Sequence, residues 1–337
     1  MTKHLLAVLA LLLLLATRLA AGEAEEDRYI AILRSDRGAN EKAWACRKLK
    51  LVGTVKAVPA LAACLTDKET AHSARYALET LPCPEAAAAL RDAVAKATDG
   101  HTIGLMINGN MTIAKMINPA VRYDPLKDFA PISLVGVAPL VLVAPASAAG
   151  GDAKSFFDAA RAAGNRWSYG SPGVGTVGHL GMELLKARTG IAPVHVPYPG
   201  YAQVFSGLVR GELQLSMLPP ALAQTQIAAG KLRGIGVTSS GRSPLMPGLP
   251  SLADAGVKNF NLEIWNAVVA PASMPAAHVA KLAEVLGAIV RTPEMRAQLF
   301  QQGWQAVGSS PEGLARRIKA DTTSLGTIIR AQNIRVQ

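Results

Sequence analysis

The sequence predicts two kinds of structure: an all-α segment of short helices, followed by an α/β region that makes up most of the chain. Three observations support this prediction. An apolar pattern within residues 28–97 repeats at an offset of about 29 residues. From about Asp99 onward, short apolar β-like runs alternate with helical stretches. The 337 residues, half of them hydrophobic, are also enough for two compact domains.

Residues 1–22 have the pattern of a secretory signal peptide. Lys3 and His4 precede an unbroken apolar run at 5–16, and small residues follow at 20–22. This run is shorter than the ~20 residues that cross a bilayer. We therefore predict that the leader is cleaved and that the mature protein is soluble and exported, to the periplasm or elsewhere outside the cytoplasm. The alternative is a leader that stays attached as a membrane anchor.

Residues 23–97 are predicted to form HEAT-like helical repeats. Each unit would comprise a helix, a tight turn and a second helix opened by Pro59 or Pro84, because proline is tolerated in a first helical turn. Stacked hairpins need a neighbouring surface to cover their ends, so docking to a protein partner is one hypothesis for this segment. Five apolar pairs carry the repeat: Ala45 with Ala74, Leu49 with Leu78, Ala57 with Ala86, Leu61 with Leu90, and Leu65 with Val94.

The chain has three cysteines, Cys46, Cys64 and Cys83. Because three is an odd number, at most one disulfide can form within the chain. The spacing contains no C-x-x-C pair and no nearby pair of histidines, so we expect neither a metal site nor a cofactor. Small, buried helix residues are the simplest interpretation of all three.

The formal net charge is +11, and the Lys and Arg residues that carry it are scattered along the sequence. Proteins that bind nucleic acids usually concentrate such residues in one basic patch, so nucleic acid is not an expected partner. A diffuse positive field suits an anionic small ligand or a negatively charged surface equally well.

Residues 98–337 are predicted to form an α/β fold with a largely parallel sheet, because strands spaced by helices usually pair in parallel. Ligands in such folds bind where strands end and loops lead into helix N-termini. Helices are expected at 153–163, 177–188 and 276–290. Strands are expected at 102–107, 129–136, 139–145, 166–171, 193–198, 213–218 and 232–239.

Residues 173–178 fit G-x-G-x-x-G, the spacing of a dinucleotide-binding loop. A dinucleotide site would also need an acidic residue at the end of the next strand, where this chain reads IAPVHVPYPGYAQ. Ser171 lacks the glycine two residues earlier that a nucleophile elbow requires. The histidines His179, His195 and His278 have no convincing acidic partner in the sequence. No catalytic residue is predicted.

The glycine cluster instead has the features of an anion-binding loop. Gly170, Gly173 and Gly175 permit a tight backbone turn, and Ser171 and Thr176 add hydroxyl donors. Free N–H groups at the start of the following helix carry positive partial charge and bind carboxylates. The alternative is a structural turn that binds nothing.

Several segments, in order, resemble the Bug-type extracytoplasmic receptors of tripartite tricarboxylate transporters over residues 98–337. These segments are YDPLKDFAPISLVG, RWSYGSPGVGTVGHLGMELLK, HVPYPG, AAGKLRGIGVTSSGRSPLMPGLPSLADAG and APASMPAAHVAKLAEVL. The resemblance implies an extracytoplasmic solute-binding protein without enzymatic activity. Such a receptor takes up a small organic carboxylate and passes it to the membrane permease subunits of the transporter.

The resemblance also implies a type II-like periplasmic binding protein fold, in which two α/β lobes close on the ligand. Lobe 1 is expected to comprise 98–139 and 237–337, and lobe 2 to comprise 140–236. The lobes would hinge near 138–142 and 233–239.

Carried over from the family, the binding residues come from both lobes. The glycine–serine loop and the VPYPG loop of lobe 2 nominate Gly170, Ser171, Gly173, Gly175, Thr176, Pro197, Tyr198 and Gly200. Lobe 1 contributes the MINGN segment with Asn108, Gly109 and Asn110, which would face them. Trp265 is expected either to form a wall of the cleft or to pack in the core.

Two departures from the family pattern matter. Leu218 stands where many relatives carry an aspartate, which favours simple or apolar carboxylates over amino acids as ligands. The family's opening strands are also absent before Asp99, so lobe 1 is expected to be incomplete, truncated at its N-terminus, with the helical repeats in their place. The alternative function is therefore a helical-repeat interaction module fused to a degenerate, non-binding receptor remnant, a chimeric chain.

Overall fold

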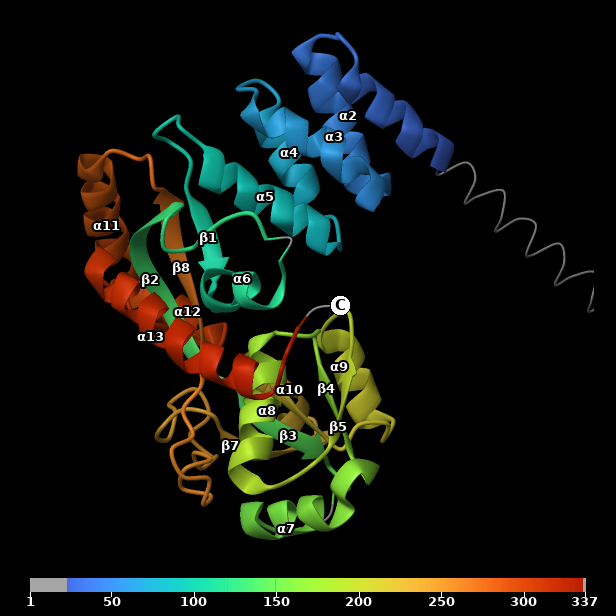
Figure 1. The fold of residues 1–337 in the computed structure, drawn as a ribbon, viewed down its shortest axis with the longest axis vertical. Helices are drawn as coiled ribbons and strands as arrows, with labels where there is room; N and C mark the ends of the chain where they lie inside the picture. The colour runs from blue at the N-terminus through green and yellow to red at the C-terminus, as the bar shows by residue number, and fades with distance from the viewer. Residues whose placement is uncertain (1–22, 120, 149, 336–337) are drawn as a thin grey trace, which may run out of the picture. The chain divides into compact units, whose positions relative to one another are not determined.

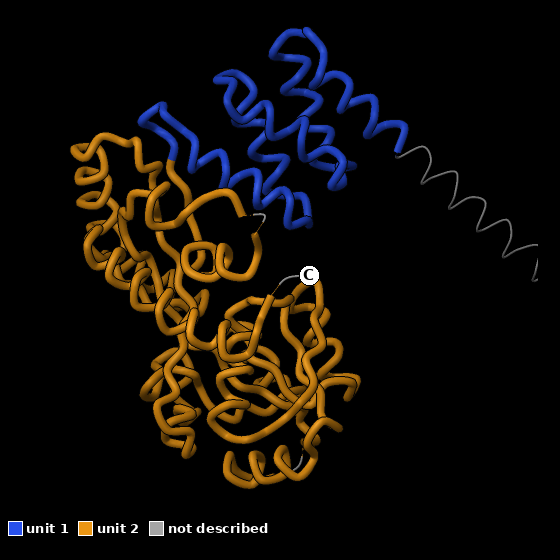
Figure 2. The backbone as a smooth tube through the Cα atoms, viewed as in Figure 1, with its two compact units in different colours: residues 1–102 blue, residues 103–337 orange. Residues whose placement is uncertain are grey.

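The computed structural model describes residues 23–119, 121–148 and 150–335. The predicted signal peptide therefore lies outside the described residues. The chain divides into two compact units, residues 1–102 and 103–337 (Figure 2). Among the helices of the described ranges, none is both long and apolar enough to cross a membrane.

The first unit is built from short helices. Pro59 and Pro84 stand in the first turns of α3 and α5, as the sequence predicts. Residues 23–34 are helical, and after them come α2 (Ala39–Val52), the 3-10 turn η1 (Val55–Ala57), α3 (Val58–Ala63), η2 (Cys64–Thr66), α4 (Ala71–Leu78) and α5 (Pro84–Lys96).

Corresponding apolar positions of the two helical hairpins are buried alike. Three pairs at the predicted offset are almost fully buried: Ala45 and Ala74, Leu49 and Leu78, Ala57 and Ala86. Leu65 and Leu90 are partly buried and pack against the same core. The hairpins α2–α3 and α4–α5 thus bury the same face of each repeat, while their identity as HEAT-like repeats stays a prediction.

Two of the three cysteines meet in the core of this unit. Cys46 on α2 and Cys64 in η2 are both buried, whereas Cys83 is half-buried. A hydrogen bond between the two thiols raises the pKa of Cys46 and lowers that of Cys64. The Cys46 thiol acts as the donor, which favours its protonated form, and the Cys64 sulfur acts as the acceptor, which favours its thiolate. All three cysteines are free thiols in this structure.

The first sheet of the second unit has the spatial order β1 (Gly104–Ile107), β8 (Glu263–Pro271), β2 (Phe129–Pro139) and β9 (Gln305–Ala306) (Figure 1). The helix α11 (Ala276–Val290) covers Ile132 and Val268 on one face, and α13 (Pro311–Ala331) packs along β2. β1 is an edge strand, and its Leu105 and Ile107 are 69% and 55% exposed. An apolar edge is what an incomplete lobe would leave.

The second sheet has the spatial order β5 (Val194–Pro197), β4 (Ser168–Ser171), β6 (Leu215–Leu218), β3 (Val141–Pro145) and β7 (Leu232–Val237). One face is covered by α7 (Ala153–Ala163) and α8 (Val177–Thr189), and the other by α9 (Tyr201–Val209) and α10 (Pro220–Ala228). The remaining elements are the π-helical turn η3 (Gly109–Ile113), α6 (Ala114–Ile117), η4 (Gly164–Arg166) and α12 (Pro293–Gln301).

The predicted largely parallel sheet is wrong. Only β4 pairs in parallel, with β5 and β6, among the strand pairs of the described chain; the other pairs are antiparallel. The chain leaves the first sheet after β2 and continues directly into the second sheet as β3, which pairs antiparallel with β6 and β7. β8 later re-enters the first sheet and pairs antiparallel with β2. The sequence analysis also missed β8, whose apolar run is interrupted by Asn266.

Thr238 joins the points where the chain passes between the two sheets. Its N–H donates to the carbonyl of Leu140 (2.9 Å), and its carbonyl accepts from the N–H of Leu262 (2.9 Å). Its Oγ1 accepts from Leu140 N (2.7 Å) and donates to Leu262 O (2.6 Å). Several residues of 245–262 pack in the cores on the second sheet, so the chain returns to the first sheet at Leu262, later than the predicted boundary at 236.

Replacing the Thr238 side chain should show what these bonds contribute. Thr238→Val keeps the volume but leaves the buried Leu140 N–H and Leu262 C=O without their partner, which costs about 2–4 kcal/mol of unfolding free energy. Thr238→Ser is the matched control because it keeps the hydroxyl. Urea denaturation of both variants measures the difference; equal midpoints for Val and Ser would contradict the assignment.

Mild oxidation of the full chain with diamide should join Cys46 to Cys64 and leave Cys83 as a thiol. The bond closes a loop of about 18 residues and should stabilise the first unit by about 3 kcal/mol. Peptide mass spectrometry after thiol alkylation identifies the linked pair, with Cys83→Ser as the control that must not prevent it. Linkage through Cys83 instead would contradict the core contact.

Candidate functional site

The glycine loop at residues 170–176 connects β4 to α8. Gly173 and Gly175 have positive φ angles of 123° and 75°, which side-chain-bearing residues rarely adopt. Gly170 is required by packing instead, since a Cβ there would lie 2.5 Å from Leu213. Thr176 caps α8, and its Oγ1 accepts a hydrogen bond from the N–H of His179. The loop therefore ends at a capped helix N-terminus, with the donors of the first helical turn beyond it.

The two hydroxyls of this loop, which the sequence analysis expected to bind the ligand, already have partners inside the protein. Ser171 is 1% exposed, and its Oγ lies 3.0 Å from Gly173 O and 2.7 Å from His195 Nε2. Thr176 Oγ1 donates to Gly173 O at 2.9 Å. These groups shape the loop, so an anion would be held by backbone N–H groups and by the positive end of α8.

A stack of rings lies beneath the loop. His179 and His195 stack with centroids 4.1 Å apart, and Tyr169 stacks on His195 at 4.8 Å. His179 Nδ1 accepts from Gly175 N at 3.0 Å. The sequence analysis gave neither histidine a role in the site, because nothing in the sequence brings β5 and the start of α8 together.

Behind the stack, Glu183 is 6% exposed, and one of its carboxylate oxygens takes part in both a hydrogen bond and an ion pair. Tyr169 OH donates to Glu183 Oε1 at 2.6 Å, and Lys186 Nζ lies 2.8 Å from the same atom. Burial, followed by the hydrogen bond to this carboxylate, raises the pKa of Tyr169 far above its ordinary range. The phenol is therefore neutral and fixed as a donor at all ordinary pH values.

The second loop of this sheet lies beside the first. Tyr198 N donates to Ser171 O at 2.9 Å, immediately after β5 ends at Pro197, and Gly200 precedes the first turn of α9. Tyr201, which the sequence analysis missed, begins α9. Its hydroxyl lies 3.3 Å from the place where a Cβ on Gly178 would be, at the start of α8.

Burial raises the pKa of Tyr201, so its phenol stays protonated at neutral pH. A protonated phenol beside the first turn of α8 is a hydrogen-bond donor that complements the N–H groups there. The only feature of the sequence that points to Tyr201 is its position directly after the VPYPG motif.

The MINGN segment of the first lobe reaches the glycine loop through its helical continuation. Asn108 is 2% exposed, and its Nδ2 donates to Glu263 O, so the amide predicted to bind the ligand holds β8 instead. Gly109 has open space where a Cβ would be, and Asn110 O accepts from Tyr123 OH.

Farther along, at the end of α6, the apolar side chain of Ile117 contacts the glycine loop of the second lobe. A Cβ on Gly175 would lie 1.9 Å from Cδ1 of Ile117 and 3.9 Å from Ile113. The loop and the first lobe therefore meet through apolar contacts, for which a glycine at 175 is required.

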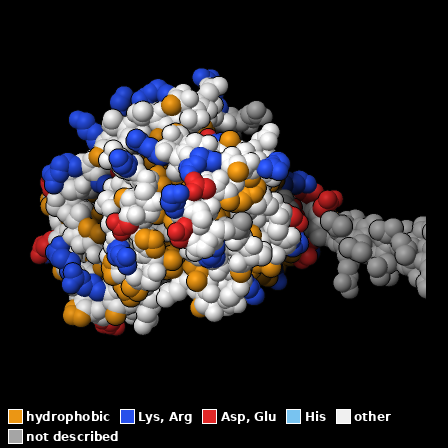
Figure 3. All heavy atoms as spheres, turned by 90° about the horizontal axis from the view of Figure 1, so that it is seen from below, with side chains coloured by type: hydrophobic (Ala, Val, Ile, Leu, Met, Phe, Trp, Pro, Cys, Tyr) orange, Lys and Arg blue, Asp and Glu red, His pale blue; other side chains and the backbone are white. Residues whose placement is uncertain are grey.

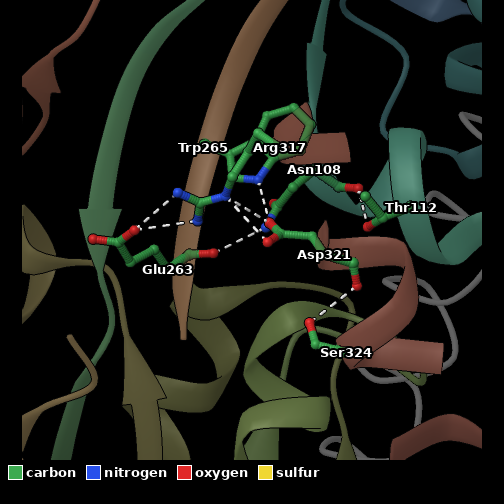
Figure 4. Close-up of polar contacts among 7 residues, drawn as sticks. All are labelled: Asn108, Thr112, Glu263, Trp265, Arg317, Asp321 and Ser324. Carbon is green, nitrogen blue, oxygen red and sulfur yellow. Dashed lines mark hydrogen bonds and ion pairs between the residues drawn. The ribbon is translucent and has the colours of Figure 1, made fainter. Parts of the chain in front are cut away.

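Trp265 is fully buried in β8 and belongs to a polar network (Figure 4). Its Nε1 donates to Asp321 Oδ2 at 2.6 Å. Arg317 bridges the two carboxylates, with Nε 3.0 Å from Asp321 Oδ2 and Nη1 3.1 Å from Glu263 Oε2. In this structure Trp265 joins β8 to α13, the packing role that the sequence analysis had left as the alternative to a cleft wall.

A hollow of about 490 Å³ lies between α6 and the C-terminal end of α13, and it shares Ile117 with the contact to the glycine loop. None of the predicted binding residues line it; its walls are Met116, Ile117, Pro119, Ile329, Arg330, Asn333, Ile334 and Arg335. On the face drawn in Figure 3, Lys and Arg side chains are scattered among hydrophobic and acidic ones. Within the described ranges, no cluster of His, Cys, Asp and Glu could hold a metal ion.

Comparison with known proteins places this chain in a family. Residues 86–334 match the model described as tripartite tricarboxylate transporter family receptor. A UPF0065 protein from the tcbD–tcbE intergenic region of a Pseudomonas species is 36% identical over 234 residues, which cover 68% of this chain and 69% of that protein. Another UPF0065 protein, from Bordetella pertussis, is 31% identical over 247 residues, 72% of this chain and 76% of that protein.

Solved structures show the same two-lobed α/β fold. R. palustris Rpa4515 with adipate superposes with a TM-score of 0.68 at 26% identity, covering 74% of this chain and 84% of that one. The periplasmic binding protein BugD gives 0.64 at 27% identity, with coverages of 72% and 82%. MatC of Rhodopseudomonas palustris with bound malate gives 0.63 at 25% identity, with coverages of 72% and 83%.

Acidification should destabilise the fold through the ring stack. Burial, then the neighbouring His179, lowers the pKa of His195 to about 4 from the 6.5 of an unperturbed histidine. Between these values the unfolded chain binds the proton and the folded chain does not, so stability is complete above pH 6.5 and declines by at most about 3 kcal/mol toward pH 4. Urea unfolding across this window measures the slope. His195→Gln keeps an acceptor for Ser171 and should flatten the profile; an unchanged slope would contradict the assignment.

Proposed function

The chain belongs to the tripartite tricarboxylate transporter receptor family, and from this premise we propose that it is an extracytoplasmic solute-binding protein for a small organic carboxylate. It would hand the ligand to the membrane permease subunits of a tripartite transporter. The receptors of this family bind substrates and do not transform them, so the chain is not an enzyme. The close pair Ser171 and His195 accordingly has a structural role.

The observation that carries the proposal is the capped start of α8 beneath the glycine loop. The N–H groups of Val177 and Gly178 stand in the first helical turn, where a helix has donors but no acceptors of its own. The positive end of the helix dipole adds to their attraction for a carboxylate. Tyr201 supplies a neutral hydroxyl donor at the same place.

The proposed ligand class follows from the apolar residues in front of the loop and at the end of β6. Leu218 is apolar and fully buried, and Ile113 and Ile117 face Gly175. No side-chain carboxylate among these residues would hold a ligand amino group. The structural relatives bound to adipate and to malate support a small dicarboxylate as the first candidate.

The binding residues of the proposed site remain those predicted from the two lobes except Trp265, which packs against α13; Tyr201 is added, and several residues have different roles. Ser171, Thr176 and Asn108 act by shaping the loops, because their polar groups have partners within the protein. The periplasm is the proposed location, in keeping with the family and with the periplasmic binding protein among the structural relatives.

A second candidate is a helical-repeat interaction module on a receptor remnant that binds no ligand. Exposed apolar side chains on the first unit favour it: Leu51 is 75% exposed, Val55 50% and Tyr76 48%. Exposed apolar residues mark a protein-binding face where they form one contiguous patch. The two candidates differ in whether the loop at α8 binds a carboxylate.

Thermal unfolding with a panel of mono-, di- and tricarboxylates, including adipate and malate, tests the proposal. A true ligand should stabilise the mature chain by ~2.7 kcal/mol at a hundredfold excess over its dissociation constant. Tyr201→Phe removes the hydroxyl and should weaken binding by about 1.5–3 kcal/mol, which is roughly tenfold or more.

Tyr76→Phe, on the exposed surface of the first unit, is the matched control and should bind as the unaltered chain does. Cooperative unfolding that no carboxylate shifts would reject the receptor function and favour the interaction module. Binding that Tyr201→Phe leaves unchanged would place the ligand away from the start of α8.

A further inference from the structure

The proposed function makes no use of two histidines beneath the glycine loop, one buried and one half-buried. His179 is 6% exposed at the start of α8, and His195 lies in β5 as the register partner of Tyr169 in β4. The rings of His179 and His195 are nearly parallel, with 14° between their planes. Packing alone would not require imidazole at either position, since an apolar ring would fill the same space.

Each imidazole contacts a different group of the loop. Gly175 N donates to His179 Nδ1 at 3.0 Å, and Ser171 Oγ lies 2.7 Å from His195 Nε2. The first contact requires that Nδ1 carry no proton, so His179 is neutral with its proton on Nε2. Rotation of the Ser171 hydroxyl allows the second contact in either neutral tautomer of His195.

The loop needs such support because its backbone is unusual. Gly175 has a positive φ of 75° and is buried, and its N–H has His179 as its partner. A buried N–H without an acceptor costs ~1–3 kcal/mol, so protonating Nδ1 replaces a hydrogen bond by two opposed donors. The turn that leads into the first turn of α8 would then lose its geometry.

Burial, rather than the charges around the pair, keeps both rings neutral. Glu183 would attract an imidazolium, but Tyr169 and Lys186 already occupy its oxygen. From β6 and α13 the neighbours in this core are apolar, namely Leu215, Met217, Leu325 and Ile329. Burial is the main cause that lowers the pKa of both histidines.

We propose that His179 and His195 are positioning residues of the carboxylate site: as a neutral stacked pair they hold Gly175 N–H and the Ser171 hydroxyl, and protonation of the pair frees the loop and releases the ligand. This inference rests on the proposed function. It adds that the receptor discharges a carboxylate in acid more readily than ligand protonation alone would cause.

The first test needs no ligand. Hydrogen–deuterium exchange of residues 172–178 is compared at neutral pH among the unaltered chain, His179→Leu and His179→Asn. Asparagine places an oxygen where Nδ1 stood, whereas leucine fills the space without an acceptor. We expect about tenfold faster exchange of the loop in His179→Leu only, equivalent to the loss of one hydrogen bond. His278→Asn, at an exposed histidine of α11, is the matched control.

The second test uses adipate as the probe in titration calorimetry near pH 7 and near pH 4. Adipate itself takes up protons in this range, so the comparison is between proteins at the same pH. The double variant His179→Asn/His195→Gln has an uncharged acceptor at both positions, and the affinity of each protein in acid is divided by its own affinity near pH 7. This ratio should fall about twofold further in the unaltered chain than in the double variant, because about half of His195 is protonated near pH 4.

The outcomes separate the two proposals. Faster loop exchange in His179→Leu without adipate binding in any variant would uphold the positioning role and count against adipate as the ligand. Loop exchange that is equal in all variants would overturn the positioning role even if adipate binds. Equal acid sensitivity of the double variant and the unaltered chain would overturn the release of ligand by the pair.

Discussion

A single buried threonine connects the points where the chain passes between its two sheets. Thr238 uses its N–H, its carbonyl and both capacities of its hydroxyl on Leu140 and Leu262. Those two residues are where β2 becomes β3 and where the chain returns to begin β8. The first lobe also packs directly on the core of the second sheet, through Ile113, Ile117 and residues of α13. A valine would fill the same volume and leave two buried polar groups unpaired.

The glycine loop shows how polar side chains serve binding without touching the ligand. Its hydroxyls are occupied by Gly173 O and by His195, and its buried N–H at Gly175 by His179. An anion is therefore left with groups that are fixed by the backbone, the first-turn donors of α8. Fixed donors need no reorganisation when the ligand arrives, which is the advantage of a rigid loop over mobile cationic side chains.

Much of this fold follows from the sequence, because it is encoded locally. The helix at 153–163 has its predicted bounds, since Asp152 and Ser155 form a capping box and its apolar spacing is helical. The direction in which the strands pair was missed because it depends on which sheet the chain enters after Leu140. That choice of sheet is determined by contacts between residues far apart in the sequence. The partners of Asn108 and Trp265 were missed for the same reason: Glu263 and Asp321 lie distant along the chain.

The contact between Ile117 and Gly175 sets a condition on any ligand of the proposed site. An apolar side chain from the first lobe occupies the space in front of the loop, so a carboxylate that enters there must displace it or pack against it. The observed affinity is then the intrinsic affinity of the open loop multiplied by the fraction of molecules in which Ile117 has moved aside. A ligand with an apolar chain loses less in this exchange than a fully polar one, because its methylene groups restore contacts with Ile113 and Ile117. Selectivity for apolar carboxylates would thus arise from the lobe contact itself, with no dedicated specificity residue.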